Sequence, residues 1–204
     1  EIGNSQQDPK FVALQDGTKN VHSAGAALEI DYRHERLSVG LDSGFAMGDD
    51  ARYLGVYDGQ NLVAVGDGNV NDARVLTDRT LTSFWFHRDY HVDLILFRQI
   101  IGTVTNAIYV KPWISYRLLD TDSLRVGARL DVMYARAFEP KGTPGGGEHW
   151  GVESDLKVFM DLPHKISLSV DAGVFVPLDA LNNPDTGARP DPTFALRGLA
   201  TWRF

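Results

Sequence analysis

The chain has 204 residues, no cysteine and a formal net charge of −7. The acidic balance and the lack of a Lys- or Arg-rich block argue against a nucleic-acid partner, because phosphate neutralisation requires a basic surface. The absence of cysteine excludes a disulfide framework. No run of about 18 apolar residues exists, which excludes a transmembrane helix.

Alternation of apolar and polar residues recurs along most of the chain and predicts β-strands, since successive side chains of a strand point to opposite faces. In the segment 26–34, for example, Leu28, Ile30 and Tyr32 alternate with charged residues. The predicted strands cover 26–34, 37–45, two strands within 82–97, two within 107–138, two within 150–176, and one at 194–204. Each is about ten residues long, which is the length that a tilted strand needs to cross a bilayer.

The predicted connections alternate in length. Short turns are expected at 34–36, 87–89, 120–123 and 163–165, and long loops at 46–79, 139–149 and 178–192. One connection breaks the rule, because the segment 100–106 is short where a long loop is due. Short turns at one rim and long loops at the other are typical of an up-and-down meander.

Two kinds of protein show this alternation: a soluble sandwich or lipocalin-like barrel with its apolar face inside, and a membrane barrel with its apolar face outside. The aromatic residues favour the membrane barrel, because they occupy the apolar parity mainly near strand ends, where the interfacial girdles of such barrels lie. These residues are Tyr32, Phe45, Tyr90, Tyr116, Tyr134, Phe138, Trp150, Phe194, Trp202 and Phe204. The opposite parity carries mixed charges with Gly and Ser, as a polar lumen does.

The last eleven residues, FALRGLATWRF, end on an aromatic residue and alternate up to it. This segment resembles the C-terminal β-signal of bacterial outer-membrane proteins, which implies that Trp202 and Phe204 form an insertion signal read by the barrel-assembly machinery. The stretch 88–112 is more loosely similar to outer-membrane barrels of the alginate-export-like type. The resemblance implies a Gram-negative source, an N-terminal signal peptide that the chain does not show, and an outer-membrane location.

We therefore expect an all-β fold, an antiparallel up-and-down transmembrane β-barrel of about nine or ten strands. Residues 1–204 form one domain in this prediction, with 46–79 as a long extracellular loop. A complete barrel and the C-terminal part of a larger barrel both stay open. The expected partners are the lipid bilayer, lipopolysaccharide and the assembly machinery, and a complex with other envelope proteins also stays open.

The charged residues on the polar parity are the candidate lumen wall. The predicted pore-lining residues are Lys111, Arg117, Arg125, Arg129, Asp131, Glu153, Asp155, Lys157, Asp171 and Arg197. The hairpin 107–138 is mainly basic and the hairpin 150–176 mainly acidic, so the two could place a transverse field across a water-filled pore. The alternative is a ladder of cross-strand ion pairs that plugs a narrow barrel.

Two motifs suggest other chemistry. His87, Asp89, His91 and Asp93 alternate in a way that could hold a metal or form an Asp-His pair, but they span a predicted turn, so a solvated turn is favoured. The oxygen-rich loop Asp67, Asn69, Asn71 and Asp78 partly matches a calcium loop, although it lacks the central Gly and the bidentate Glu. A polar surface loop is favoured there.

The sequence thus predicts an outer-membrane pore that passes small hydrophilic solutes through a charged lumen, with no enzymatic activity and no cofactor. A non-conducting barrel that acts as a scaffold or surface-binding protein through its long loops is the alternative.

Overall fold

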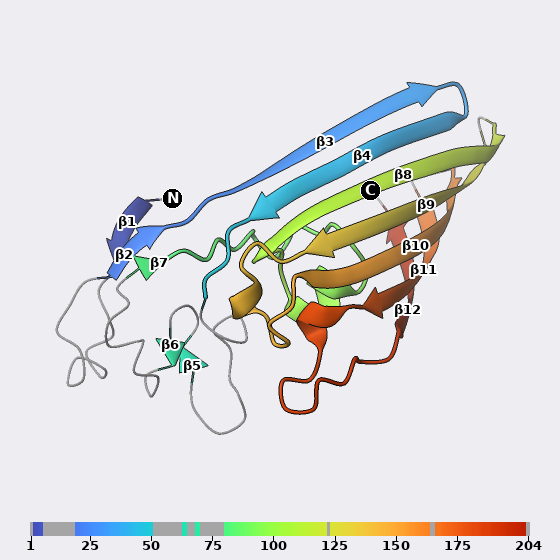
Figure 1. Cartoon of the computed structure of the whole chain (residues 1–204). Coiled ribbons are helices and arrows are strands. Elements are labelled where there is room, and N and C mark those ends of the chain that lie inside the picture. The colour runs from blue at the N-terminus through green and yellow to red at the C-terminus, as the bar shows by residue number, and fades with distance from the viewer. Residues whose placement is uncertain are drawn as a thin grey trace.

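The computed structural model describes residues 2–5, 19–50, 63–64, 68–69, 80–121, 123–163 and 166–202. A seven-stranded antiparallel sheet in the order β12-β11-β10-β9-β8-β4-β3 dominates it and curves into a trough (Figure 1). Its strands are β3 (Gly25–His34), β4 (Leu37–Ala46), β8 (Ala107–Asp120), β9 (Arg125–Arg136), β10 (His149–Leu162), β11 (Ile166–Pro177) and β12 (Thr193–Trp202).

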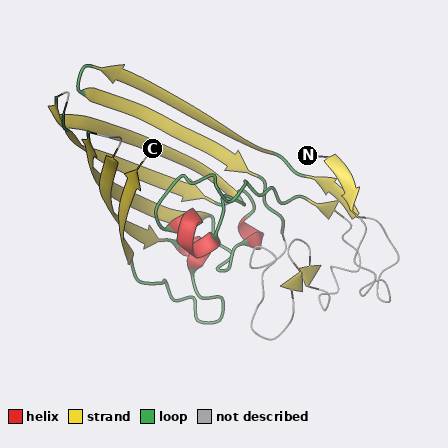
Figure 2. Ribbon diagram, turned by 180° about the vertical axis from the view of Figure 1, so that it is seen from behind, coloured by secondary structure: helices red, strands yellow, loops and turns green. Residues whose placement is uncertain are grey.

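The remaining elements are short. The strands β1 (Ile2–Ser5), β2 (Lys19–His22) and β7 (Thr80–Leu81) form one small sheet, and β5 (Val63–Ala64) pairs with β6 (Gly68–Asn69). The helical elements among the described residues are a π-helix, η2 (Leu96–Ile101), and two 3₁₀ turns, η3 (Pro140–Gly142) and η4 (Asp179–Leu181) (Figure 2). Within them, no helix is long and apolar enough to cross a membrane.

The all-β, antiparallel prediction is confirmed, but the sheet is not closed into a barrel. Among the described residues, β3 and β12 are its two edges, and the sheet has seven strands rather than the expected nine or ten. The two strands predicted within 82–97 are wrong. That segment adds no strand to the seven-stranded sheet, and its ladder contact with the described residues is an isolated bridge between Trp85 and Thr105.

With 82–97 outside the sheet, long and short connections between its strands alternate without exception. Because 82–97 forms no strand of the sheet, residues 47–106 are one long connection between β4 and β8. Long connections therefore follow β4, β9 and β11, and short ones follow β3, β8 and β10. We call the two rims of the sheet the loop end and the turn end. Apart from Ala46, which is the last residue of β4, the predicted loop 46–79 lies within this connection, and most of it is outside the described residues.

The convex face of the sheet is apolar and exposed. One row across all seven strands shows this, because each of its residues is the register partner of the next: Tyr32, Val39, Ile114, Leu130, Leu156, Ala172 and Leu196. Leu196 is 78% exposed and Phe194 77%. An exposed apolar surface of this extent marks a membrane or protein contact.

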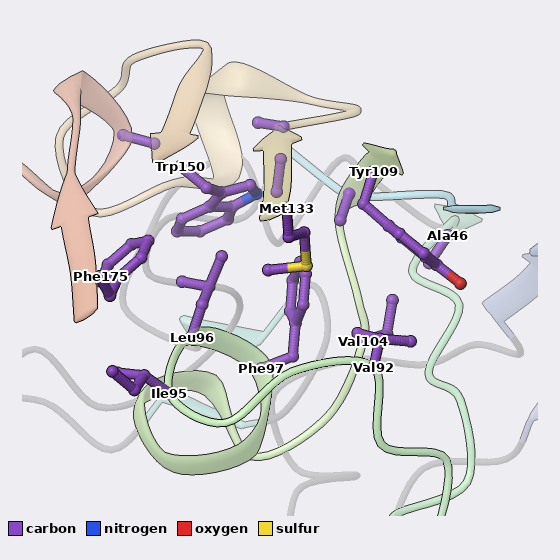
Figure 3. Close-up of a cluster of buried hydrophobic side chains, with 14 of the residues drawn as sticks. Ala46, Val92, Ile95, Leu96, Phe97, Val104, Tyr109, Met133, Trp150 and Phe175 are labelled. Carbon is purple, nitrogen blue, oxygen red and sulfur yellow. The ribbon is translucent and has the colours of Figure 1, made fainter. Parts of the chain in front are cut away.

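The loop half of the concave face is a packed core instead. Residues 82–106, which we call the inner segment, fold against it, so that six consecutive residues, 92–97, are buried. Figure 3 shows Leu96 and Phe97 among Met133, Trp150 and Phe175, which come from three strands of the sheet. This position corrects the prediction for Trp150, which is fully buried rather than on the outer face. The cause is a register irregularity between His149 and Gly151 that reverses the parity at the start of β10.

Two glycines let aromatic rings lie flat on the concave face. A Cβ at Gly40 would overlap the ring of Trp113, and one at Gly127 would overlap the ring of Phe159. In both pairs the ring covers the backbone of a neighbouring strand, where only glycine leaves room.

Candidate functional site on the concave face

A buried carboxylate of β10 is the main anchor of the inner segment. Glu153, which is 1% exposed, accepts hydrogen bonds from three successive backbone N–H groups. Their nitrogens belong to Leu94 at 2.9 Å, Ile95 at 2.7 Å and Leu96 at 2.9 Å. The first turn of a helix leaves its N–H groups without intrahelical partners, so a carboxylate at that point satisfies them. Glu153 therefore fixes where η2 begins.

A second carboxylate, Asp93, completes this cap. It accepts hydrogen bonds from the N–H groups of Phe97 at 2.7 Å and Arg98 at 3.1 Å. Burial, and next the negative charge of Glu153, raise the pKa of Asp93 to about 7, while the two N–H groups and the positive charge of Lys111 oppose that rise. Asp93 consequently takes up a proton in the neutral range.

Lys111 links the inner segment to the opposite part of the sheet. Its Nζ donates to the carbonyl of Val92 at 2.8 Å and lies 2.9 Å from Asp42 and 3.6 Å from Asp131. Asp131 also accepts hydrogen bonds from the guanidinium of Arg129, the shortest at 2.6 Å. One buried ammonium therefore joins β4, β8, β9 and the inner segment.

Two further contacts extend this ionic network. The guanidinium of Arg129 lies 4.0 Å from the ring centre of Trp113, whose indole N–H donates to Asp42 at 3.2 Å. Near the β12 edge of the same face, Arg197 of β12 donates two hydrogen bonds to Asp171 of β11, at 2.9 and 2.6 Å. The pairs of Lys111 with Asp42 and of Arg197 with Asp171 join neighbouring strands, as in a ladder of ion pairs, whereas Arg129 and Asp131 belong to one strand. The pore with a transverse field and the plugged barrel both stay predictions.

The turn end of the concave face is a basic hollow of about 560 Å³. The cationic residues that line it are Arg33, Arg36, Arg117, Arg125, Arg129 and Lys157. Five hydroxyl residues line it as well: Ser38, Ser115, Ser167, Ser169 and Thr201. Trp113 and Phe159 form part of its wall, and among the described residues Asp161 is its one acidic lining residue.

All ten predicted pore-lining residues lie on the concave face, in two groups. Arg117, Arg125, Arg129 and Lys157 line the basic hollow. The middle of the face holds the other six: Lys111, Asp131, Glu153, Asp155, Asp171 and Arg197. There, Asp155 accepts a hydrogen bond from the N–H of Leu94 at 3.2 Å. That the face lines a water-filled pore stays a prediction.

The alternating His and Asp residues do not come together. His87 and Asp89 form an exposed contact of 3.5 Å beside a turn closed by the N–H of Tyr90 and the carbonyl of His87, whereas Asp93 is buried at the cap of η2. In the part of the chain that the structure describes, no group of three His, Asp or Glu residues could hold a metal ion. The calcium candidates Asp67, Asn71 and Asp78, and the side chain of Asn69, lie outside the described residues.

The insertion signal is described only in part. Trp202 is exposed on the convex face, at the end of β12, and Phe204 lies outside the described residues. The role of both residues in insertion stays a prediction.

Three residues of the site were not identified from sequence: Asp42, Trp113 and Asn106. Asp42 and Trp113 stand on the polar parity of their strands, so the alternation could have found them. Asn106 adopts a left-handed conformation (φ 43°) and joins two loops by exchanging hydrogen bonds with the backbone of Glu139 at 2.9 and 2.7 Å. Nothing in the sequence pattern around Asn106 indicates those contacts.

Neither a scan against protein-family models nor a search of curated proteins finds a match to this chain. The function is therefore argued from the geometry of the sheet alone.

Proposed function

We propose that the protein is an outer-membrane transport barrel that passes small hydrophilic solutes along its charged concave face. The observation that carries this proposal is the opposite character of the two faces. Aliphatic side chains cover the convex face, while the concave face holds the ionic network and the basic hollow. A soluble β-protein has the reverse arrangement, with its apolar face covered.

The positions of the exposed aromatic residues support a bilayer as the partner of the convex face. Tyr32, Tyr116 and Trp202 stand toward the turn end, and Phe45, Phe138 and Phe194 toward the loop end. Aromatic side chains gather at both water interfaces of a membrane barrel, and aliphatic ones fill the band between them.

Closure of the barrel is part of the proposal. A bilayer offers no water to the backbone groups along β3 and β12, so both edges must pair with strands when the sheet is in the membrane. In the closed state the concave face becomes the lumen wall and the inner segment narrows the passage at its loop half.

Conductance of the purified protein in planar bilayers tests this proposal. We expect discrete channel steps from the detergent-extracted protein, and extraction should require detergent rather than salt or carbonate. Recovery as a soluble monomer without detergent would overturn the membrane location, and insertion without any conductance would overturn the pore.

One observation favours the second candidate, a non-conducting scaffold or surface-binding barrel. The inner segment and the strands enclose a tightly packed core at the loop half, with Trp150 and Phe175 fully buried. If this core closes the passage, the barrel inserts into bilayers but carries no current, and the long connections at the loop end are its functional surface.

A further inference from the structure

We propose that the basic hollow at the turn end binds small multivalent oxyanions, such as compounds with several phosphate groups. This inference rests on the proposed function, because it names the class of solute that the lumen would select. It is unexpected from composition, since the whole chain carries a formal net charge of −7.

The first argument is the excess of positive charge. Each of three acidic groups beside the hollow is already engaged: Asp120 with Arg117 and Arg125, Asp131 with Arg129, and Asp31 with Arg33. Arg36 and Lys157 form no ion pair with any described residue. With Asp161 included, the six cations of the hollow still exceed these acidic neighbours by two.

The second argument is a like-charged pair. Arg129 of β9 and Lys157 of β10 are direct register partners on the concave face. Like charges directly opposite each other destabilise a sheet. On its other side Lys157 faces Asp171, which is already paired with Arg197. An oxyanion placed between Arg129 and Lys157 would reduce that repulsion and give Lys157 an ionic partner.

The third argument is the supply of hydrogen-bond donors. On the same row, Ser38 and Ser115 follow next to Arg129, and Ser169 and Thr201 line the hollow from β11 and β12. Guanidinium groups match the geometry of phosphate oxygens through paired hydrogen bonds, and hydroxyls donate to the same oxygens.

The volume of the hollow and the distribution of its cations over several strands favour a ligand with more than one charged group. The cations come from β8, β9, β10 and the end of the β3–β4 hairpin, and the hollow of about 560 Å³ exceeds the volume of one phosphate with its nearest waters. An anion with several charged groups can contact more of these cations at once than chloride can.

The test is calorimetric titration of the detergent-purified full chain with sodium tripolyphosphate at low ionic strength. We expect saturable binding that weakens as salt is added. The double variant Arg36→Gln/Lys157→Gln should bind at least about tenfold more weakly, because it removes the two cations that form no ion pair with a described residue. The matched control, Arg136→Gln/Lys141→Gln, removes the same charge at the loop end and should bind like the wild type.

Absence of binding by the folded wild type would overturn the site, and equal weakening in both double variants would overturn its location. Circular dichroism and resistance to unfolding in detergent report that each variant is folded. The titration does not depend on current through a bilayer, so it separates the two proposals. Conductance without binding refutes the site alone, whereas binding without conductance refutes the pore and leaves the site standing.

Discussion

The anchoring role of Glu153 gives the sharpest test of how the concave face is organised. Truncation in Glu153→Ala leaves the buried N–H groups of Ile95 and Leu96 without an acceptor, while the N–H of Leu94 keeps Asp155 at 3.2 Å. Each unsatisfied buried donor costs about 1–3 kcal/mol. Removing a buried carboxylate returns part of that cost, because its own desolvation is no longer required. The loss of the acceptor for these two donors outweighs that return, and we expect a net destabilisation of about 2–4 kcal/mol.

Urea unfolding in detergent micelles measures this change, and hydrogen exchange locates it. The amides of Ile95 and Leu96 should exchange faster in Glu153→Ala, whereas the amides of Leu94 and Phe97 keep Asp155 and Asp93 as acceptors and should change less. Glu153→Gln retains one carbonyl oxygen and should be intermediate. Asp161→Ala, on the same strand and face, is the control, and a Glu153→Ala variant as stable as that control would refute the anchoring role.

Three further predictions concern the two faces. Leu130→Arg places a charge on the convex face and should cost about 2–4 kcal/mol of stability in the membrane, measured by unfolding from vesicles. Because the pKa of Asp93 is raised to about 7, its contribution to stability is full below about pH 4 and is lost as the pH rises toward 7, by at most about 4 kcal/mol. Unfolding of Asp93→Asn should therefore vary less over that range. Lys111→Met leaves Asp42 facing an uncharged side chain and should cost about 3–5 kcal/mol, partly recovered by adding Asp42→Asn.

Each of these predictions has a contrary outcome. Ser167→Arg introduces the same side chain on the concave face, opposite Asp161, so equal damage from it and from Leu130→Arg would mean that the faces are assigned wrongly. An unchanged pH dependence in Asp93→Asn would exclude Asp93 as the titrating group. Failure of Asp42→Asn to recover any stability in the Lys111 variant would argue that the ammonium acts through the carbonyl of Val92 instead.

The sequence predicts the strands of the sheet well, because a strand with one apolar and one polar face must alternate at every second residue. The long hairpins β8–β9 and β10–β11 follow that rule over most of their length and lie where the alternation places them. The polar parity likewise selects the residues of the concave face, including Arg129, Lys157 and Asp171.

The inner segment is where this reasoning fails. Phe84 and Phe86 alternate with polar or other residues as at the start of a strand. Residues 92–97, however, are all buried, whereas a strand with one polar face would expose every second residue. Their conformation depends on acceptors from Glu153, whose hydrogen bonds to them span 57 to 59 positions of the chain, and a local pattern does not contain such a contact. The alternation also predicts the wrong face for Trp150. One irregular residue at the start of β10 reverses the face to which the side chains before it point.

The glycines at 40 and 127 set how wide the basic hollow is. Because each lies under the ring of Trp113 or Phe159, the rings lie along the wall instead of projecting from it. An added methyl group at either position would lift its ring away from the backbone and into the basic hollow. At Gly40 it would also move the indole that lies 4.0 Å from the guanidinium of Arg129. The width of the basic hollow can thus be changed at positions that carry neither charge nor side chain.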